Sequence, residues 1–391
     1  MKGWKEIPLS DVCTIFDGPH ATPKKQSEGI IFLGISSLNY SGRIDPSFFE
    51  YVSEDDYKNW TKRVTPQQND IVFSYETKLG TAGIIPANFK CCLGRRMGLL
   101  RPNKKILPRF LLYSYLSPSF QNIIVENTNP GSTVDRIALT ELPDFKISVP
   151  ELTEQQAIVK ILQSIDDKID LLHRQNATLE AMAEALFRQW FVVEAKEEWE
   201  AVKIKSLVNI KSGYAFKSSS FISSGFYKLI TIKAVQDGFL TLNGADSIDD
   251  LPYNMPEYCK LAVGDILLSL TGNVGRCCFV DQENTLLNQR VALLVPNNPR
   301  DWAFTYILFR QQQMKASLED LAKGSAQANL SPIETGDMEF MAPSASIFQH
   351  FQTTTPLLGK VIKNKLQIYT LEKLRDTLLP KLMSGEVRVK C

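Results

Sequence analysis

The sequence has few of the residues from which catalytic and metal sites are usually built. Its 391 residues include three histidines, widely scattered, and seven cysteines with no CxxC pair. A zinc site and general-base chemistry on histidine are therefore not expected. The GxxxxGKS/T, HExxH and GxSxG signatures are all missing. We therefore expect a chain that is not an enzyme and that has no cofactor and no metal of its own.

Long hydrophobic runs are also missing. No apolar run approaches about 18 residues, the length that spans a membrane, and the N-terminal "MKGWKEIPLS" lacks an apolar signal core. Adjacent cysteines at 91–92 and 277–278 lie in apolar runs typical of strands. We expect these thiols to be buried and reduced. The sequence thus predicts a cytoplasmic protein without a membrane partner.

The sequence also lacks an excess of charge of one sign, because the net charge is only +1. The charge is nevertheless unevenly distributed, with +3 over 1–150, −6 over 151–200, −1 over 201–343 and +5 over 344–391. The acidic and the basic segment both have helical patterns. The balance alone gives no support to nucleic-acid binding.

What the sequence does contain is an internal repeat. "NDIVFS" at 69–74 is repeated as "GDILLS" at 264–269, and "GRRMGLLRPN" at 94–103 as "NQRVALLVPN" at 288–297. Ordered matches are Trp4 with Trp199, Asp70 with Asp265, Arg96 with Arg290 and Gly131 with Gly324, at offsets of 195, 195, 194 and 193. A period this long indicates a duplicated folding unit.

A long helix is predicted over 152–191. Thr153 and Gln156 have capping-box spacing, and no Gly or Pro follows. A seam steps by four and three residues from Ile158 to Leu186, with Asn176 as its one polar member. The alternative is an ordinary amphipathic helix packed on its own domain. About 40 residues at ~1.5 Å each would span ~60 Å, which favours a coiled coil.

A second long helix is predicted over 357–387. Its seam runs from Leu357 to Leu382 with Asn364 and Arg375 as polar members, Pro380 is placed to kink or end it, and Gly385 is a plausible stop. Opposite charges favour pairing of the two helices with each other. If they pair antiparallel, the globules lie at opposite ends of a rod, related by a pseudo-two-fold axis.

The predicted fold class is α+β, because each repeat mixes short strands with helices. We expect two pseudo-repeated globules separated by two long helices that pair as an antiparallel coiled coil. The predicted bounds are 1–150 for the first globule, 151–193 for its helix, 194–343 for the second globule and 344–391 for the last helix.

The chain resembles the specificity subunits of type I restriction–modification systems over essentially its whole length. The segments that carry the resemblance are "ELTEQQAIVKILQSIDDKIDLLHRQNATLEAMAEALFRQWF", "LEKLRDTLLPKLMSGEV" and the series "GDILLS…TGNVG…NQRVALL…GSAQANLS". The first half departs more, with "NDIVFSYETKLG" and "GSTVDRIAL" at the corresponding places.

The resemblance implies a function that composition cannot indicate. Such subunits are not catalytic. Each globule is a target recognition domain for one half of a split, asymmetric sequence in double-stranded DNA. The helical rod sets the spacer and docks two methyltransferase subunits, and restriction subunits join them. S-adenosylmethionine, ATP and Mg are implied for these partners.

Candidate DNA-binding residues come from polar loops of the two globules, since Arg, Asn and Gln are the side chains that hydrogen-bond base edges. The alternative for each candidate is an ordinary solvated loop residue that does not contact DNA. The candidates are Lys24, Lys25, Thr77, Lys78, Arg95, Ser132, Thr133 and Arg136 in the first half, and Lys217, Ser218, Thr271, Asn273, Arg276, Ser325, Gln327 and Asn329 in the second. In the helices, Asn176 and Asn364 are expected to fix the coiled-coil register.

Two other functions were considered. A scaffold with two protein-binding globules on a coiled coil and no DNA contact fits the architecture equally well, and a neighbouring gene with an adenine-methyltransferase NPPF or NPPY motif would argue against it. A restriction enzyme with its own cleavage site is excluded by the missing catalytic residues. The low net charge predicts weak DNA binding by this chain alone.

Overall fold

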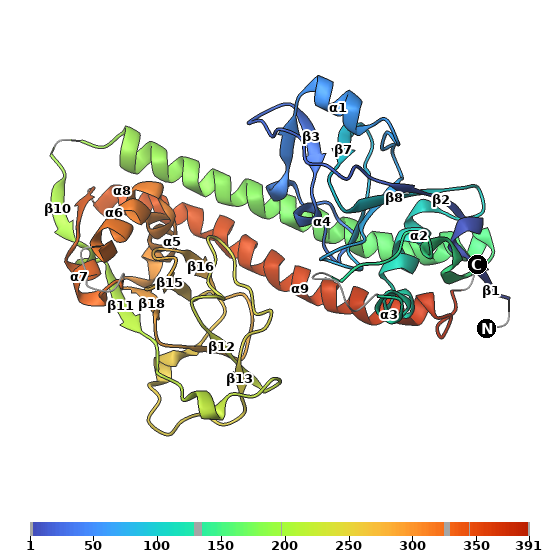
Figure 1. Ribbon diagram of the computed structural model, residues 1–391. Helices are drawn as coiled ribbons and strands as arrows, with labels where there is room; N and C mark the ends of the chain where they lie inside the picture. The colour runs from blue at the N-terminus through green and yellow to red at the C-terminus, as the bar shows by residue number, and fades with distance from the viewer. Residues whose placement is uncertain (1–2, 129–134, 197, 324–328, 344, 390–391) are drawn as a thin grey trace. The chain divides into compact units, whose positions relative to one another are not determined.

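The computed structural model describes residues 3–128, 135–196, 198–323, 329–343 and 345–389 (Figure 1). The chain divides into two compact units. Unit 1 comprises Met1–Lys168 and Leu371–Cys391, and unit 2 comprises Ile169–Thr370. The division falls within the long helices α4 (Leu152–Arg188) and α9 (Thr355–Met383). Each unit therefore combines one globule with a part of both helices.

The globule of unit 1 has three small sheets. β1 pairs with β9, β2-β8-β5-β6 form an antiparallel sheet, and β4-β3-β7 form a sheet in which β3 and β7 are parallel. The strands are β1 Lys5–Pro8, β2 Cys13–Asp17, β3 Ile30–Leu33, β4 Glu50–Val52, β5 Ile71–Ser74, β6 Ala82–Ile84, β7 Cys91–Leu93, β8 Met97–Pro102 and β9 Lys146–Val149. The helices of this globule are α1 Glu54–Trp60, α2 Pro108–Leu116 and α3 Pro118–Glu126.

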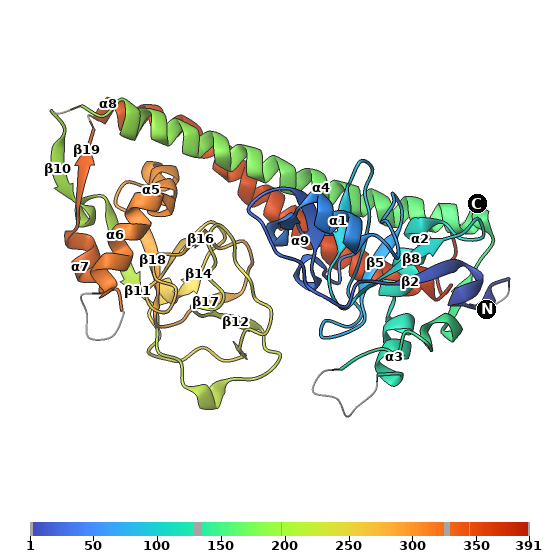
Figure 2. The same ribbon diagram turned by 45° about the horizontal axis from the view of Figure 1, so that its top comes forward.

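The globule of unit 2 repeats this plan. β10 pairs with β19, as Figure 2 shows, β11-β18-β15-β16 form an antiparallel sheet, and β13-β12-β17-β14 form a sheet in which β12 and β17 are parallel. The strands are β10 Glu200–Lys203, β11 Val208–Ser212, β12 Tyr227–Ile230, β13 Ser247–Ile248, β14 Lys260–Leu261, β15 Ile266–Ser269, β16 Cys277–Phe279, β17 Thr285–Leu287, β18 Val291–Pro296 and β19 Glu339–Ala342. The helices are α5 Trp302–Arg310, α6 Gln312–Lys323, α7 Pro332–Asp337 and α8 Ala345–Phe351.

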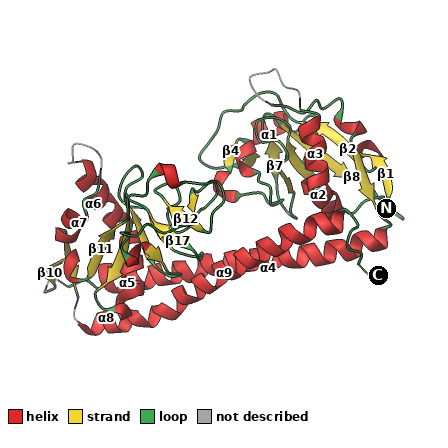
Figure 3. Ribbon diagram, turned by 90° about the horizontal axis from the view of Figure 1, so that it is seen from below, coloured by secondary structure: helices red, strands yellow, loops and turns green. Residues whose placement is uncertain are grey.

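The predicted repeat is confirmed down to strand register. Cys13 pairs with Pro102 between β2 and β8, and Val208 pairs with Pro296 between β11 and β18. The central strands β5 and β15 are buried at every position, which explains why "IVFS" and "ILLS" are continuous apolar runs rather than alternating ones. The expected α+β class is confirmed, and Figure 3 shows the strands and helices of each globule.

Both long helices are confirmed, and the seam of α4 is buried at Ile158, Leu162 and Ile169. The helices pair antiparallel within each unit. In unit 1, Glu154 Oε1 is 3.6 Å from Arg388 Nε, and the later Asp166 Oδ1 is 3.6 Å from the earlier Arg375 Nη1. In unit 2, Asn364 of α9 donates to Asn176 of α4, and the later Phe187 lies 5.7 Å from Phe351 of α8, which precedes α9.

The end of α9 differs from one expectation. Pro380 lies inside the helix, which continues to Met383. The helix then stops at Gly385, whose φ of +67° is the left-handed conformation of a C-terminal cap. Proline has no N–H, so it leaves the Asp376 carbonyl without its helical donor. The cost is local because only Lys381–Met383 follow it in the helix.

The described residues also show the state of the thiols, the helix lengths and the grouping of possible metal ligands. The six cysteines within the described residues are all free and buried, as expected for the two adjacent pairs. No helix in the described ranges is long and apolar enough to cross a membrane. The described His, Cys, Asp and Glu side chains form no group of three able to hold a metal ion.

Candidate DNA-recognition surfaces

One edge of each globule is built from two segments that are far apart in the sequence. In unit 1, Ile137 N donates to Tyr75 O at 2.9 Å, and in unit 2, Leu330 N donates to Leu270 O at 2.8 Å. Just beyond these bonds lie the β-bridges Glu76–Arg136 and Thr271–Asn329. The turn after β5 or β15 is thereby held against the segment that precedes the last strand of its globule.

On its other side, each edge contacts an arginine whose backbone is in the left-handed conformation. Arg96 has φ +70° and Arg290 has φ +74°. Tyr75 N donates to Arg96 O at 3.2 Å, and Leu270 N donates to Arg290 O at 2.8 Å. Left-handed backbone costs a non-glycine residue about 1–3 kcal/mol. The surrounding strands therefore impose the same turn in both repeats.

In unit 2 these segments surround a hollow of about 680 Å³. Gln289 and Arg290 are exposed at its rim, whereas Thr271 is only 7% exposed and its Oγ1 has no hydrogen-bond partner. The lining residues are Ser212, Gly213, Ile232, Leu270, Thr271, Gly272, Gln289, Arg290, Asn329, Leu330, Ser331 and Pro332. Such a lining combines an apolar floor with hydrogen-bonding side chains.

Unit 1 has a hollow of about 630 Å³, which is lined by the equivalent arginine, Arg96. Its lining includes Lys25, Arg95 and Arg96 together with the aromatic residues Phe32 and Phe48. Glu50 also lines it, and Lys25 Nζ lies 2.6 Å from Glu50 Oε1. The lining of this hollow therefore has more charged side chains than that of unit 2.

The structure brings together a part of the predicted set. Thr77, Lys78 and Arg136 lie about the Glu76 turn, and Thr77 N donates to Asp135 O at 3.3 Å. Lys25 and Arg95 share the hollow of unit 1, and Thr271 and Asn329 share that of unit 2.

Other predicted residues lie elsewhere. Lys24, Lys217 and Ser218 are exposed but do not line the hollows. Asn273 is exposed on the turn after β15. Arg276 is turned toward its own globule, where its Nη1 donates to Gln236 Oε1. Ser132, Thr133, Ser325 and Gln327 lie outside the described residues.

Sequence reasoning missed three residues of this site, namely Arg96, Gln289 and Arg290. A signal was available, because Arg96 and Arg290 match between the repeats at an offset of 194 residues. A polar residue that the two repeats share within otherwise apolar strand runs is a stronger indication than a polar residue in a loop of only one repeat. The positive φ that gives these arginines their place cannot be inferred from the sequence.

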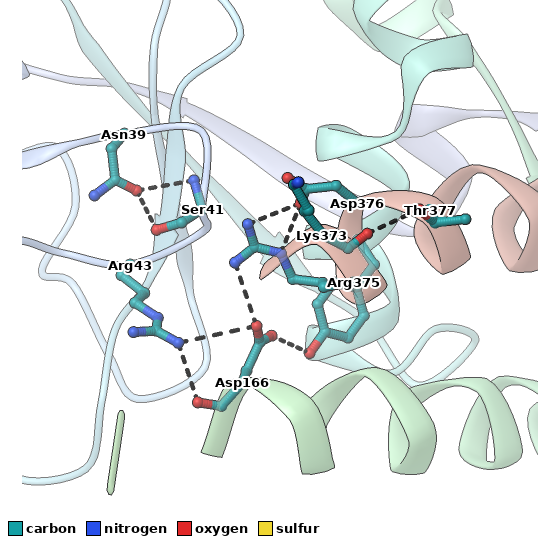
Figure 4. Close-up of polar contacts among 9 residues, drawn as sticks. Asn39, Ser41, Arg43, Asp166, Lys373, Arg375, Asp376 and Thr377 are labelled. Atoms are coloured by element: carbon teal, nitrogen blue, oxygen red, sulfur yellow. Dashed lines mark hydrogen bonds and ion pairs between the residues drawn. The ribbon is translucent and has the colours of Figure 1, made fainter. Parts of the chain in front are cut away.

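A buried carboxylate, that of Asp166, links the globule of unit 1 to α4 and α9 (Figure 4). Asp166 on α4 accepts from Tyr113 OH at 2.7 Å, and its Oδ1 lies 3.6 Å from Arg375 Nη1 on α9. Arg43 Nη2 donates to the Asp166 carbonyl at 3.0 Å. Burial raises the pKa of Asp166, and the hydrogen bond from Tyr113 and the charge of Arg375 oppose that shift.

Unit 2 uses a buried arginine for the same purpose. Arg310, at the end of α5, is 3.1 Å from Glu180 Oε2 and 3.4 Å from Glu184 Oε1 on α4, and it also donates to Tyr306 OH at 2.8 Å. Burial disfavours its charge, but Tyr306 and Glu180 outweigh that effect and raise the pKa of Arg310. The guanidinium thus remains charged in its largely buried position.

The two predicted register asparagines meet in unit 2. Asn364 Nδ2 donates to Asn176 Oδ1 at 2.9 Å and to Gln175 Oε1 at 3.3 Å. Both asparagines are buried, Asn364 completely. A polar pair of this kind favours the alignment that joins its members over alignments that bury each one alone.

Comparison with known proteins gives a consistent result. The sequence model of the family described as type I restriction modification DNA specificity domain matches residues 1–181 and 196–350. The type I restriction enzyme MjaIX specificity subunit of Methanocaldococcus jannaschii is 24% identical, over 74% of this chain and 71% of its own length. The HindI specificity subunit of Haemophilus influenzae is 23% identical, over 74% of this chain and 80% of its own length.

A solved structure shares the fold. The crystal structure of the type I restriction–modification S subunit from M. genitalium aligns with a TM-score of 0.59 at 18% identity, covering 97% of this chain and 96% of that one. The family matches begin and end close to the two repeats and together cover more than half of the chain. The resemblance noted in the sequence is confirmed, and this chain belongs to the family of type I restriction–modification DNA specificity subunits.

Proposed function

We propose that each globule of this specificity subunit reads one half of a split, asymmetric target in double-stranded DNA. The observation that carries the proposal is the pair of family matches over two globules that share strand register but differ in the polar residues of one edge. A common apolar frame with different polar edges suits two recognition surfaces that distinguish different bases.

The chemistry of the two hollows fits the reading of base edges. Arg donates a bidentate pair of hydrogen bonds to guanine, Asn and Gln do so to adenine, and each good pair contributes about 1–3 kcal/mol of discrimination. Unit 2 offers Arg290, Gln289 and Asn329 around one hollow. Lysines outside the hollows, such as Lys24 and Lys217, are suited to phosphates, which fix position rather than sequence.

We further propose that the paired helices set the spacer and dock two methyltransferase subunits, which restriction subunits then join. The 37 residues of α4 correspond to ~55 Å at ~1.5 Å per residue, enough to span half-sites about 34 Å apart. Leu171 and Met182 are 41% and 48% exposed on α4, and Leu374 is 45% exposed on α9. Single exposed apolar side chains are ordinary on a protein surface, so the docking proposal rests on the family and not on these residues.

In this proposal the chemistry belongs to the partners. S-adenosylmethionine would serve the methyltransferase subunits, and ATP and Mg the restriction subunits. The net charge of +1 leaves this chain with little attraction for phosphates. We therefore expect the isolated chain to bind DNA weakly and the methyltransferase subunits to supply much of the neutralising charge.

A selection experiment tests the proposal. The chain is purified alone and together with the methyltransferase subunit proposed as its partner, and each sample selects fragments from random double-stranded DNA. The complex is expected to enrich one split motif, two short specified parts around a fixed gap, whereas the isolated chain enriches little.

Two results would count against this account. A tight, sequence-specific gel shift by the isolated chain contradicts the charge argument. If the complex assembles but enriches no split motif, the proposed division of the target between the two globules is wrong, and a scaffold function becomes the better account.

A further inference from the structure

We propose that Arg290 is the guanine-reading residue of unit 2, and that Glu76 withholds the equivalent arginine, Arg96, from DNA in unit 1. This inference rests on the proposed function, because it assigns one base contact within a recognition surface. It also identifies a specific difference between the two halves of the target.

The equivalence of the two arginines is structural as well as sequential. Arg96 lies between β7 and β8, and Arg290 lies between β17 and β18, both with left-handed backbone. The main-chain carbonyl of each accepts a hydrogen bond from the residue after β5 or β15. Glycine or asparagine adopts this conformation more easily than arginine does. The turn itself therefore does not require arginine, and its side chain is the reason that we infer for finding it in both repeats.

The surroundings of the two side chains differ in charge at the residue that follows Tyr75 or Leu270. In unit 1, Arg96 Nε lies 2.7 Å from Glu76 Oε2, and Nη1 donates to Thr77 Oγ1 at 3.4 Å. The position equivalent to Glu76 in unit 2 is Thr271, which is neutral. Arg96 is thus neutralised within its own unit, at side-chain exposures of 32% and 22% for the arginine and the glutamate.

Arg290 has no such restraint within the described part of unit 2. It is exposed, forms no ion pair there, and is the only charged residue among the described lining of its hollow. Thr271 belongs to the same lining, and its Oγ1 is buried and lacks a hydrogen-bond partner. A buried hydroxyl without a partner costs free energy. A rotation of the Thr271 side chain toward the hollow would give this hydroxyl a partner on a group that enters.

These observations favour guanine as the ligand. A guanidinium presents two parallel N–H donors that match N7 and O6 of guanine in the major groove, and lysine lacks this fork. A phosphate contact through Arg290 would be insensitive to base identity. The assignment therefore predicts a change in sequence preference, and not only in affinity, when the fork is removed.

The test sequences methylated adenines in cells that carry the complete system with wild-type chain, R290K or R300K. R290K keeps the positive charge and removes the fork, and Arg300 is an exposed arginine of the same unit that does not line the hollow. R290K is expected to relax guanine at one position of one half-site, lowering discrimination by about tenfold or more. R300K is expected to leave the motif unchanged.

A third variant, E76T, gives unit 1 the residue that unit 2 has. It frees Arg96 and is expected to alter only the other half of the motif. An unchanged motif with E76T overturns the restraint by Glu76. An unchanged motif with R290K, or a uniform loss of methylation at every sequence, overturns the assignment of Arg290.

The outcomes separate this inference from the function on which it rests. A wild-type chain that yields no split motif contradicts both. A wild-type split motif that R290K does not alter contradicts only the inference. Thermal unfolding of each purified variant, compared with that of wild type, identifies any loss of methylation that comes from misfolding.

Discussion

Unit 1 and unit 2 fold the same strands in the same register but bury opposite charges where each globule meets its helices. In unit 1 the buried group is the Asp166 carboxylate of α4, and Tyr113 and Arg375 surround it. In unit 2 it is the Arg310 guanidinium of α5, with Glu180 and Glu184 around it. The edges differ similarly, with Glu76 in one unit and Thr271 in the other.

The comparison shows which features of the repeated unit the fold requires. The buried strands are nearly interchangeable because burial demands only apolar side chains of suitable size. The polar contacts are not interchangeable, since each charge needs a partner in its own unit. Differences in polar residues can thus accumulate while the frame stays the same, and this separation is what two different recognition surfaces require.

The largest expected effect comes from the buried arginine of unit 2. R310M leaves Glu180 half-buried beside an apolar side chain, and breaking a largely buried ion pair in this way is expected to cost about 3 kcal/mol. Urea unfolding of the whole chain measures the loss, and hydrogen–deuterium exchange locates it. Peptides of unit 2 are expected to exchange faster, with those of unit 1 unchanged.

The matched control for this prediction is R300M, at an exposed arginine of the same globule. Its effect is expected to stay within about 0.5 kcal/mol. If R310M and R300M destabilise the chain equally, the anchoring role of Arg310 is refuted.

A smaller loss is expected from the buried carboxylate of unit 1. D166A removes the acceptor of Tyr113 and leaves Arg375 with less compensation, at a cost of about 2–3 kcal/mol. The distance of 3.6 Å to Arg375 is longer than the 3.1 Å between Arg310 and Glu180. Faster exchange should now appear in unit 1. Faster exchange confined to unit 2 would reverse the comparison.

The asparagine pair predicts non-additive effects. N364L leaves Asn176 buried without its partner and is expected to cost about 1–3 kcal/mol in the free energy of unfolding. The double variant N176L/N364L removes both polar groups and is expected to be as stable as the wild type or more stable. A double-mutant cycle by urea unfolding measures the coupling. Additive losses would show that the hydrogen bond between the two asparagines contributes nothing.

The smallest expected effect is a dependence on pH. Burial raises the pKa of Asp166 above its ordinary value of 3.8, so the folded chain holds this proton more tightly than the unfolded chain does. The contribution of this group to stability is fully present below pH 3.8 and is lost as the pH rises through the folded pKa.

D166N removes this titration. The free energy of unfolding of the wild type relative to D166N should therefore decrease as the pH rises through that window, as measured by urea unfolding at several pH values. A difference that increases with pH instead would mean that the charges of Arg375 and Arg43 outweigh burial and lower the pKa of Asp166.

Much of the frame follows from the sequence, and most of the site does not. The repeat, both long helices and the seam at Ile158, Leu162 and Ile169 follow from periodic apolar residues, because burial acts at regular spacing. The meeting of Thr271 with Asn329 depends on a bridge between distant segments. Arg290 depends on a left-handed turn that side-chain composition does not specify. Pro380 was expected to kink or end α9, but α9 continues past it to Met383.

The most direct test of the central claim is a long-read methylome of the host with and without this gene. The account predicts that removing the gene eliminates methylated adenine at one split motif, two short specified parts around a fixed gap. Loss of methylation at a continuous, unsplit motif would contradict the claim that two globules each read one half. An unchanged methylome in a host whose methyltransferase is expressed and active would contradict the claim that this chain directs methylation at all.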